Sequence, residues 1–196
     1  MRHITKLIFF LLFFPCIVFN SINNIKGQKS GLTMDNKDSS FSSDLKCVAK
    51  EKKNPESKED PIIVKTCTWR KYKFVSTGQP DDKGRYGYDY ELFLIDKGKS
   101  IKIINSDLFN DKVSQLENLI NEKIKSEFDA NAKDSIDGDC LRGVEYSKFG
   151  INQIGITFNE KNQMEFNVSL GLGSACLSQE GYSVSFELKD IREYLK

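Results

Sequence analysis

Two kinds of side chain alternate along residues 86–95, and both could do chemistry if this stretch is a strand. The stretch places Tyr86, Tyr88 and Tyr90 on one face and Asp89 and Glu91 on the other. Three aromatic rings in a row could stack on a sugar. Two carboxylates could act as the acid and base of a glycoside hydrolase. The stretch therefore indicates either a binding surface or a catalytic pair.

The catalytic interpretation is the weaker one. Residues i and i+2 on any strand face meet the carboxylate separation that glycosidases need, so the spacing carries little information. The tyrosines share their face with Leu92 and Leu94, which should lie in the core. We therefore expect a hydrophobic core that ends in a sheet rim, with at least two of the tyrosines half-buried. Tyr86, nearest the turn, is the one that we expect to be exposed.

A second candidate for contact is the Gly/Ser-rich segment 171–181. It lacks the residue order of a phosphate-binding loop and that of a nucleophile elbow. The chain has one histidine, His3, which lies too early to belong to a mature exported protein. No imidazole could then activate a serine in this segment. We expect no catalytic residue. The binding residues expected from the two segments are Tyr86, Tyr88, Ser174 and Gln179.

Metal chemistry finds little support in the sequence. The acidic stretch 129–139 begins like a calcium-binding EF-hand. However, Asp134 stands where the loop needs glycine, and Cys140 stands where it needs glutamate. The cysteines form no C-x-x-C pair, which disfavours a zinc site. We expect no metal and no cofactor.

Residues 1–27 have the features of a secretory signal peptide. A short basic start precedes an apolar run of 13 residues, from Leu7 to Phe19, and polar residues follow. A membrane span needs about 20 apolar residues, so an uncleaved anchor is the weaker alternative. Pro15 stands where a lipidated Cys16 would need a small residue before it. We expect a secreted or periplasmic protein that meets the membrane only through this transient segment.

Loss of residues 1–27 changes the charge of the chain. Three of its 29 bases and none of its 28 acids lie there, so 26 bases and a formal charge of −2 remain. No basic excess exists to neutralise phosphates, and we do not expect a nucleic-acid partner. Residues 28–60 are polar and predict a flexible leader. Residues 61–196 predict a single domain, which we expect to be monomeric.

Four cysteines remain after residue 27, an even number that is typical of disulfides in an exported chain. Four cysteines allow three pairings. We favour Cys47–Cys67 and Cys140–Cys176, because each pair would join neighbouring segments within its own half of the chain.

Residues 61–196 predict an α+β fold, an antiparallel sheet of hairpins with one long amphipathic helix packed on it. Alternating β-branched and aromatic residues predict the strands. Residues 62–77 are expected to form one bent strand or two. The other expected strands are 85–95, 100–105, 153–159, 163–169 and 182–188. An apolar stripe at helical spacing predicts the helix. The stripe consists of Val113, Leu116, Leu119, Ile120, Ile124 and Phe128. Asn121, Glu122, Lys123 and Lys125 are expected on its solvated face, and Asn110 or Asp111 at its start.

The second half of the chain carries an order of motifs that resembles a known domain. A DLF turn and a helix of the form L-x-x-L-I-x-x-x-I occupy 106–124, a hairpin occupies 154–171, and a strand leads into a terminal Tyr-Leu over 182–196. This order resembles the uncharacterised C-terminal domain of PdaC-type peptidoglycan deacetylases and of RsiV-type anti-sigma factors that sense lysozyme. The resemblance covers about half of the chain. It implies an exported α+β accessory or binding domain at the cell envelope.

The resemblance does not imply deacetylase activity, because the deacetylase domain and its metal ligands have no counterpart in this chain. We expect a secreted or periplasmic, non-enzymatic domain that acts at the cell envelope on a protein or a glycan. One alternative is a carboxylate-dependent glycan hydrolase, which would need Asp89 and Glu91 to line a deep pocket together. Another is a secreted inhibitor or immunity protein, which would present a protruding loop at 129–140 or 171–181.

Overall fold

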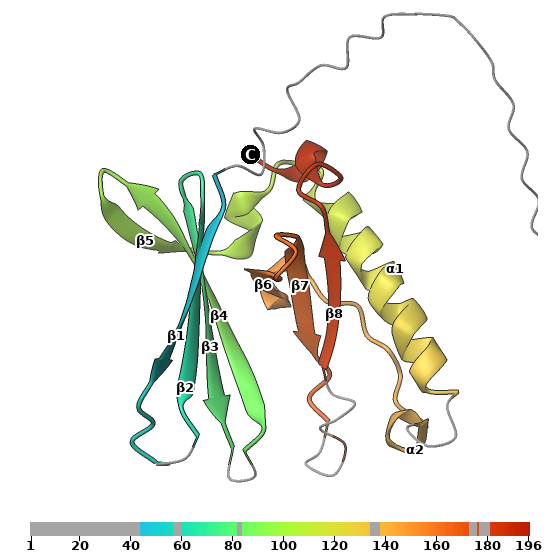
Figure 1. Cartoon of the computed structure of the whole chain (residues 1–196). Helices are drawn as coiled ribbons and strands as arrows, with labels where there is room; N and C mark the ends of the chain where they lie inside the picture. Colours follow the sequence, from blue (N-terminus) through green and yellow to red (C-terminus); the bar gives the residue numbers. More distant parts are fainter. Residues whose placement is uncertain (1–43, 57–59, 82–83, 134–137, 173–175, 177–180) are drawn as a thin grey trace, which may run out of the picture. The chain divides into compact units, whose positions relative to one another are not determined.

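The first half of the fold is a five-stranded antiparallel meander, drawn from blue to green in Figure 1. The computed structural model describes residues 44–56, 60–81, 84–133, 138–172, 176 and 181–196, all within the compact unit 35–196. The strands are β1 (Lys46–Lys52), β2 (Ile62–Trp69), β3 (Tyr72–Pro80), β4 (Tyr86–Asp96) and β5 (Lys99–Ile103). The turn between β4 and β5 is tight because Lys97 and Gly98 both have positive φ, 47° and 78°.

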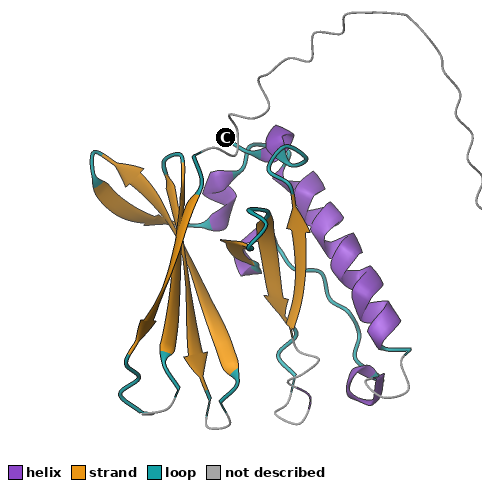
Figure 2. Cartoon of the chain, in the orientation of Figure 1, coloured by secondary structure: helices purple, strands orange, loops and turns teal. Residues whose placement is uncertain are grey.

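The second half consists of a long helix and a second antiparallel sheet (Figure 2). The helix α1 (Val113–Asn131) precedes strands β6 (Gly155–Phe158), β7 (Met164–Ser169) and β8 (Gly181–Phe186), which pair in sequence order. Short helical elements are η1 (Asn105–Leu108), α2 (Gly138–Leu141), η2 (Ile151–Gln153) and η4 (Arg192–Tyr194). The expected α+β class with one long helix is confirmed. The strands divide between two sheets instead of forming one.

The helix α1 packs on the second sheet, where it lies alongside β8 (Figure 1). Four members of the predicted apolar stripe are buried, namely Leu116, Ile120, Ile124 and Phe128. The Phe128 ring meets the Tyr182 ring of β8 at 6.1 Å between centroids. The Lys123 ammonium lies 4.5 Å from the centroid of the Phe186 ring. Burying each of the four large apolar side chains of the stripe stabilises the fold by about 1.5–3 kcal/mol.

The two sheets meet at one end of the meander. Trp69, Phe74 and Leu92 of the first sheet are buried there. The Phe74 ring packs edge-to-face on Phe158 of β6, with ring centroids 5.1 Å apart. The Lys65 ammonium of β2 donates to the backbone carbonyl of Phe158. This junction fixes β6 beside β4 and leaves the other end of the sheets for a cleft.

Asn121 of α1 is buried, so its expected place on the solvated face is wrong. Its side chain is 3% exposed. Its Nδ2 donates to the carbonyl of Phe149 at 2.9 Å, and its Oδ1 accepts from the Phe149 N–H and the Tyr146 hydroxyl, both at 2.8 Å. The amide therefore holds the segment that runs from α2 to η2 against the helix. At the start of α1, Asn110 Oδ1 accepts the backbone N–H of Lys112 at 2.9 Å, just before the helix begins.

The structure differs from the expected flexible leader, because β1 lies within residues 28–60. β1 pairs with β2 along its whole length, and Cys47 stands directly opposite Cys67. Both expected disulfides, Cys47–Cys67 and Cys140–Cys176, are present, with S–S distances of 2.04 Å and 2.12 Å. They close loops of 20 and 36 residues. Each closure stabilises the fold by about 3–4 kcal/mol in the chain-entropy description.

The expected polar loop at 129–140 belongs in part to helices, because α1 extends to Asn131 and α2 begins at Gly138. The expected signal peptide lies outside the described residues. Within the part of the chain that the structure describes, no helix is both long and apolar enough to span a membrane.

Candidate functional site

The three tyrosines of β4 form a ladder of rings on the inner face of the first sheet. The Tyr86 and Tyr88 ring centroids lie 6.3 Å apart, those of Tyr88 and Tyr90 lie 6.4 Å apart, and neighbouring rings are within 32° of parallel. Tyr86 and Tyr90 are half-buried, as expected for at least two of the three. Tyr88 is 49% exposed. The ladder therefore passes from solvent at Tyr88 towards the core at Tyr90.

The expectation that Tyr86 is the exposed tyrosine is wrong. Its hydroxyl donates to the backbone carbonyl of Pro61 at 2.9 Å, which holds the ring against the segment before β2. Its partial desolvation and the nearby Asp60 carboxylate raise the pKa of Tyr86. Tyr88 is left as the ring that a ligand could reach.

A glycine opposite Tyr88 leaves room for its ring over the face of the sheet. Gly78 of β3 stands directly opposite Tyr88 in the strand register. A Cβ at Gly78 would lie 2.6 Å from Tyr88 Cε1, which is closer than atoms can approach. The Tyr88 ring therefore lies over the Gly78 backbone, and its exposed part lines the cleft.

A second glycine receives Tyr90 at the junction of the two sheets. A Cβ at Gly155 of β6 would lie 2.1 Å from Tyr90 Cδ2. Gly155 is held in place because Asn105 Nδ2 donates to the carbonyls of Ile151 and Ile154, at 3.0 Å and 2.6 Å. Burial first, and then the Glu165 carboxylate, raise the pKa of Tyr90 to about 12. Tyr90 thus closes the deep end of the ladder as a neutral ring.

The wall that faces the ladder is the side of the second sheet turned away from α1. Strand alternation gives the helix side the apolar residues and leaves short side chains here. Gly155, Asn167 and Ser183 stand side by side in the register of β6, β7 and β8, and Ser169 pairs with Gly181. This wall therefore offers amide and hydroxyl groups and no charge at these five positions.

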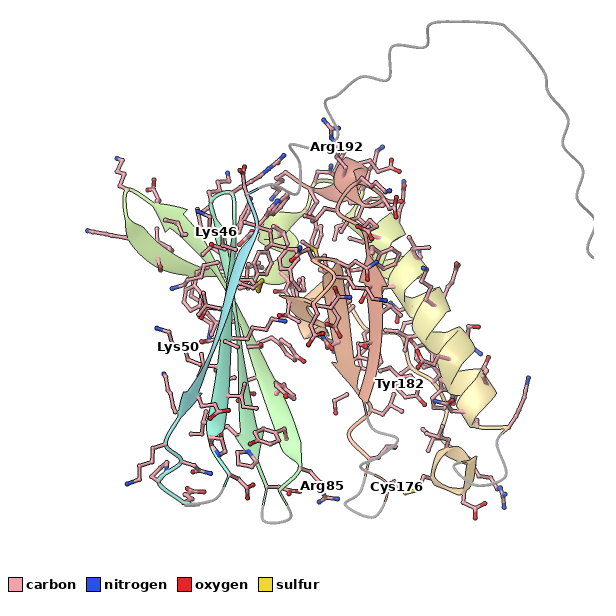
Figure 3. The ribbon with its side chains drawn as sticks, viewed as in Figure 1. Lys46, Lys50, Arg85, Cys176, Tyr182 and Arg192 are labelled. Atoms are coloured by element: carbon pink, nitrogen blue, oxygen red, sulfur yellow. A yellow bond between two sulfur atoms is a disulfide. The ribbon has the colours of Figure 1, made fainter. Side chains whose placement is uncertain are left out.

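A cleft of about 1210 Å³ lies between the ladder and this wall. Figure 3 labels Arg85 at the tip of the β3–β4 hairpin and Tyr182 at the start of β8, and both residues line the cleft. Among the other lining residues are Gln79, Asp81, Tyr86, Tyr88, Asp89, Tyr90, Gln153, Asn167 and Ser169. A cleft with aromatic rings on one side and a few polar groups on the other is typical of a ligand site.

Asn167 is the site residue that sequence reasoning missed. Its Nδ2 is buried and has no hydrogen-bond partner among the residues that the structure describes. A buried donor left without a partner costs about 1–3 kcal/mol. The sequence held one indication of this role, because Asn167 lies between Glu165 and Ser169 on the polar side of an alternating strand.

The charged groups near the ladder do not form a catalytic pair. Glu91 accepts from the Lys102 ammonium at 2.7 Å on the outer face of the sheet, and it does not line the cleft. Asp89 lies on the same outer face, although it is among the residues that line the cleft. At the hairpin tip, Arg85 and Asp81 form an ion pair at 2.6 Å. Asp89 and Glu91 therefore do not line one deep pocket together.

Two of the expected binding residues, Ser174 and Gln179, lie outside the described residues. Cys176 between them is described and is joined to Cys140 of α2. Among the residues that the structure describes, no three His, Cys, Asp or Glu side chains lie close enough together to hold a metal ion. Of the expected site residues, the structure brings Tyr86 and Tyr88 together in the cleft.

Comparison of the chain with protein-family models, with curated proteins and with solved structures finds no match.

Proposed function

We propose that this protein is a secreted or periplasmic, non-enzymatic binding domain that acts at the cell envelope on a protein or a glycan. The ligand occupies the cleft between β4 and the second sheet. The observation that carries this proposal is the Tyr88 ring, which is 49% exposed on the wall of a 1210 Å³ cleft. Aromatic side chains that are held rigidly in a cleft are the usual anchors of a binding site.

Export is supported by two features of the chain. The first 27 residues have the pattern of a signal peptide. All four cysteines after that segment are paired, and paired cysteines are typical of oxidising compartments outside the cytosol. The resemblance of residues 106–196 to envelope domains points to the same place of action.

Binding is favoured over catalysis by the chemistry of the cleft walls. The wall opposite the tyrosines presents the amide of Asn167 and the hydroxyls of Ser169 and Ser183. The Asp81 carboxylate at the hairpin tip is engaged by Arg85. These groups position a ligand by hydrogen bonds, and none of them is a poised acid–base pair.

Retention by the cell envelope tests the proposal. The mature protein is mixed with an envelope fraction from the source cells, and the bound share is measured by co-sedimentation over a range of protein concentrations. Tyr88→Ala should weaken retention about tenfold or more, since truncating an aromatic anchor at a binding hot spot costs about 2 kcal/mol or more.

Val48→Ala is the matched control. Val48 is 54% exposed and lies on the opposite face of the same sheet, so its truncation removes a similar exposed apolar group away from the cleft. The control should be retained like the parent protein. Equal retention of all three proteins, or no retention of the parent, would overturn the proposal.

A further inference from the structure

We infer that the cleft takes an uncharged glycan, with a sugar ring stacked on Tyr88 and an acceptor oxygen of the glycan bonded to Asn167. This inference rests on the proposed function and narrows its ligand from a protein or glycan to one chemical class.

The shape of the tyrosine ladder favours a sugar ring as the ligand. The Tyr88 ring lies over Gly78, lines the cleft and is 49% exposed. Tyr86 and Tyr90 continue the surface on both sides with nearly parallel rings. A pyranose ring has an apolar C–H face and a rim of hydroxyl groups. That combination matches a flat aromatic surface with polar groups across a cleft.

The lack of net positive charge at the cleft favours an uncharged ligand over an anionic one. Arg85 is the cationic residue among those that line it, and Asp81 holds its guanidinium at 2.6 Å. Asp89 also lines the cleft, and the Glu165 carboxylate is near enough to act on Tyr90. An anionic polymer would meet these carboxylates with little to compensate them. A neutral ligand has no such cost.

The Nδ2 donor of Asn167 favours a ligand that carries an acceptor oxygen. Its buried Nδ2 has no acceptor among the described residues, although the side chain lines the cleft. A sugar hydroxyl or an acetamido carbonyl supplies an acceptor oxygen. Binding would then satisfy a donor that the free protein leaves without a partner, and the gain would appear only in the complex.

An extended peptide is the competing occupant. Residues 86–91 of β4 pair with β3 on one side, and β5 pairs only with residues 92–96, so the described chain leaves this edge free. However, a peptide added to the edge lies in the plane of the sheet and does not cover a ring that lies over the sheet face. The exposed face of Tyr88 therefore favours the glycan.

Tyrosine ring signals in NMR spectra test the inference. The chain has seven tyrosines, so a ring-labelled sample reports on the four that line the cleft and on three others at once. The mature protein is titrated with soluble oligomers of N-acetylglucosamine, of glucose and of galacturonic acid. At least one neutral oligomer should shift the Tyr88 signal saturably and leave the Tyr194 signal in place.

Two variants sharpen the result. Tyr88→Ala and Asn167→Leu should each weaken binding of the neutral oligomer about tenfold, whereas Val48→Ala should not change it. Leucine has the shape of asparagine, and an unchanged Tyr194 signal will confirm that the variant is folded. Because Tyr88 is half exposed, its truncation tests the inference even if Asn167→Leu fails to fold.

The inference is overturned if neither neutral oligomer shifts the cleft tyrosines up to its solubility limit, or if the galacturonate oligomer binds more tightly. Extended peptides from a library could instead compete with the envelope fraction for the protein at micromolar affinity, while no sugar binds. That result would identify the edge of β4 as the site. Those results leave the proposed function standing as long as Tyr88→Ala still loses retention by the envelope. If Tyr88→Ala and the parent protein were retained equally by the envelope fraction, the proposed function itself would be overturned.

Discussion

Asn121 fixes a long connection to the helix through one side chain. It bonds both the N–H and the carbonyl of Phe149 and accepts from Tyr146. Asn121→Ala would leave the two backbone groups of Phe149 without these partners, so we expect the free energy of unfolding to fall by about 2–4 kcal/mol. Urea denaturation measures the change. Tyr146→Phe removes only the hydroxyl that donates to Oδ1 and to the backbone carbonyl of Asn121, and it should cost about 1 kcal/mol. Equal losses for the two variants would contradict the role of Asn121.

Tyr90 should make stability depend on alkaline pH. Its pKa is raised from 10.0 to about 12, first by burial and then by Glu165. The folded state therefore keeps this proton while the unfolded chain loses it. The stabilisation is fully present below about pH 10 and is lost as the pH rises towards about 12.

Thermal unfolding across that range measures the effect, and Tyr90→Phe should make the decline with pH shallower. It should not abolish the decline, because the pKa values of Tyr86 and Tyr146 are raised as well. A decline of the same steepness in the variant would show that Tyr90 is not held as a buried neutral ring.

At the scale of the strands, two glycines that face tyrosines should respond differently to alanine. Tyr90 is held between the sheets, so Gly155→Ala should cost about 1–3 kcal/mol of stability through overpacking. Tyr88 can swing towards solvent, so Gly78→Ala should cost less than about 1 kcal/mol. Gly78→Ala should nevertheless weaken envelope retention, because the Tyr88 ring leaves its position over residue 78. Chemical denaturation and the retention assay together separate the two effects, and the reverse order of stabilities would refute this picture of the ladder.

The strands and the helix could be predicted because their periodicity is local. β1 could not, since all of its residues are exposed and only the register with β2 and the disulfide at Cys47 hold it. The division into two sheets depends on which distant strands pair, and alternation does not reveal this. Asn121 was predictable in part, because it stands three residues before Ile124 and seven before Phe128 on the same helix face.

The tyrosine ladder was visible in the sequence, whereas its exposed member was not. Which ring is exposed depends on residues that are distant in sequence. Pro61 holds Tyr86, Gly78 supports Tyr88 and Gly155 receives Tyr90. The partner wall with Asn167 lies more than 70 residues further along the chain. Neither wall alone predicts a cleft, so the site required the tertiary fold.

At the scale of the whole molecule, the Cys47–Cys67 disulfide should act on one edge of the fold. A Cys47→Ser, Cys67→Ser double variant should lose about 3 kcal/mol of stability and speed amide exchange in β1. The strands β6 to β8 should keep their protection at temperatures where the variant remains folded. Exchange followed by mass spectrometry checks this, and a β1 that stays protected without the disulfide would show that backbone pairing alone holds it.

The central claim is that the molecule meets its ligand through Tyr88, and tyrosine nitration of the protein bound to the envelope fraction tests it most directly. Tyr88 is the exposed ring of the ladder, so it should be modified readily in the free protein. We predict strong protection of Tyr88 in the bound protein and unchanged modification of Tyr194, which does not line the cleft. Retained protein in which Tyr88 is nitrated as fast as in solution would contradict the claim.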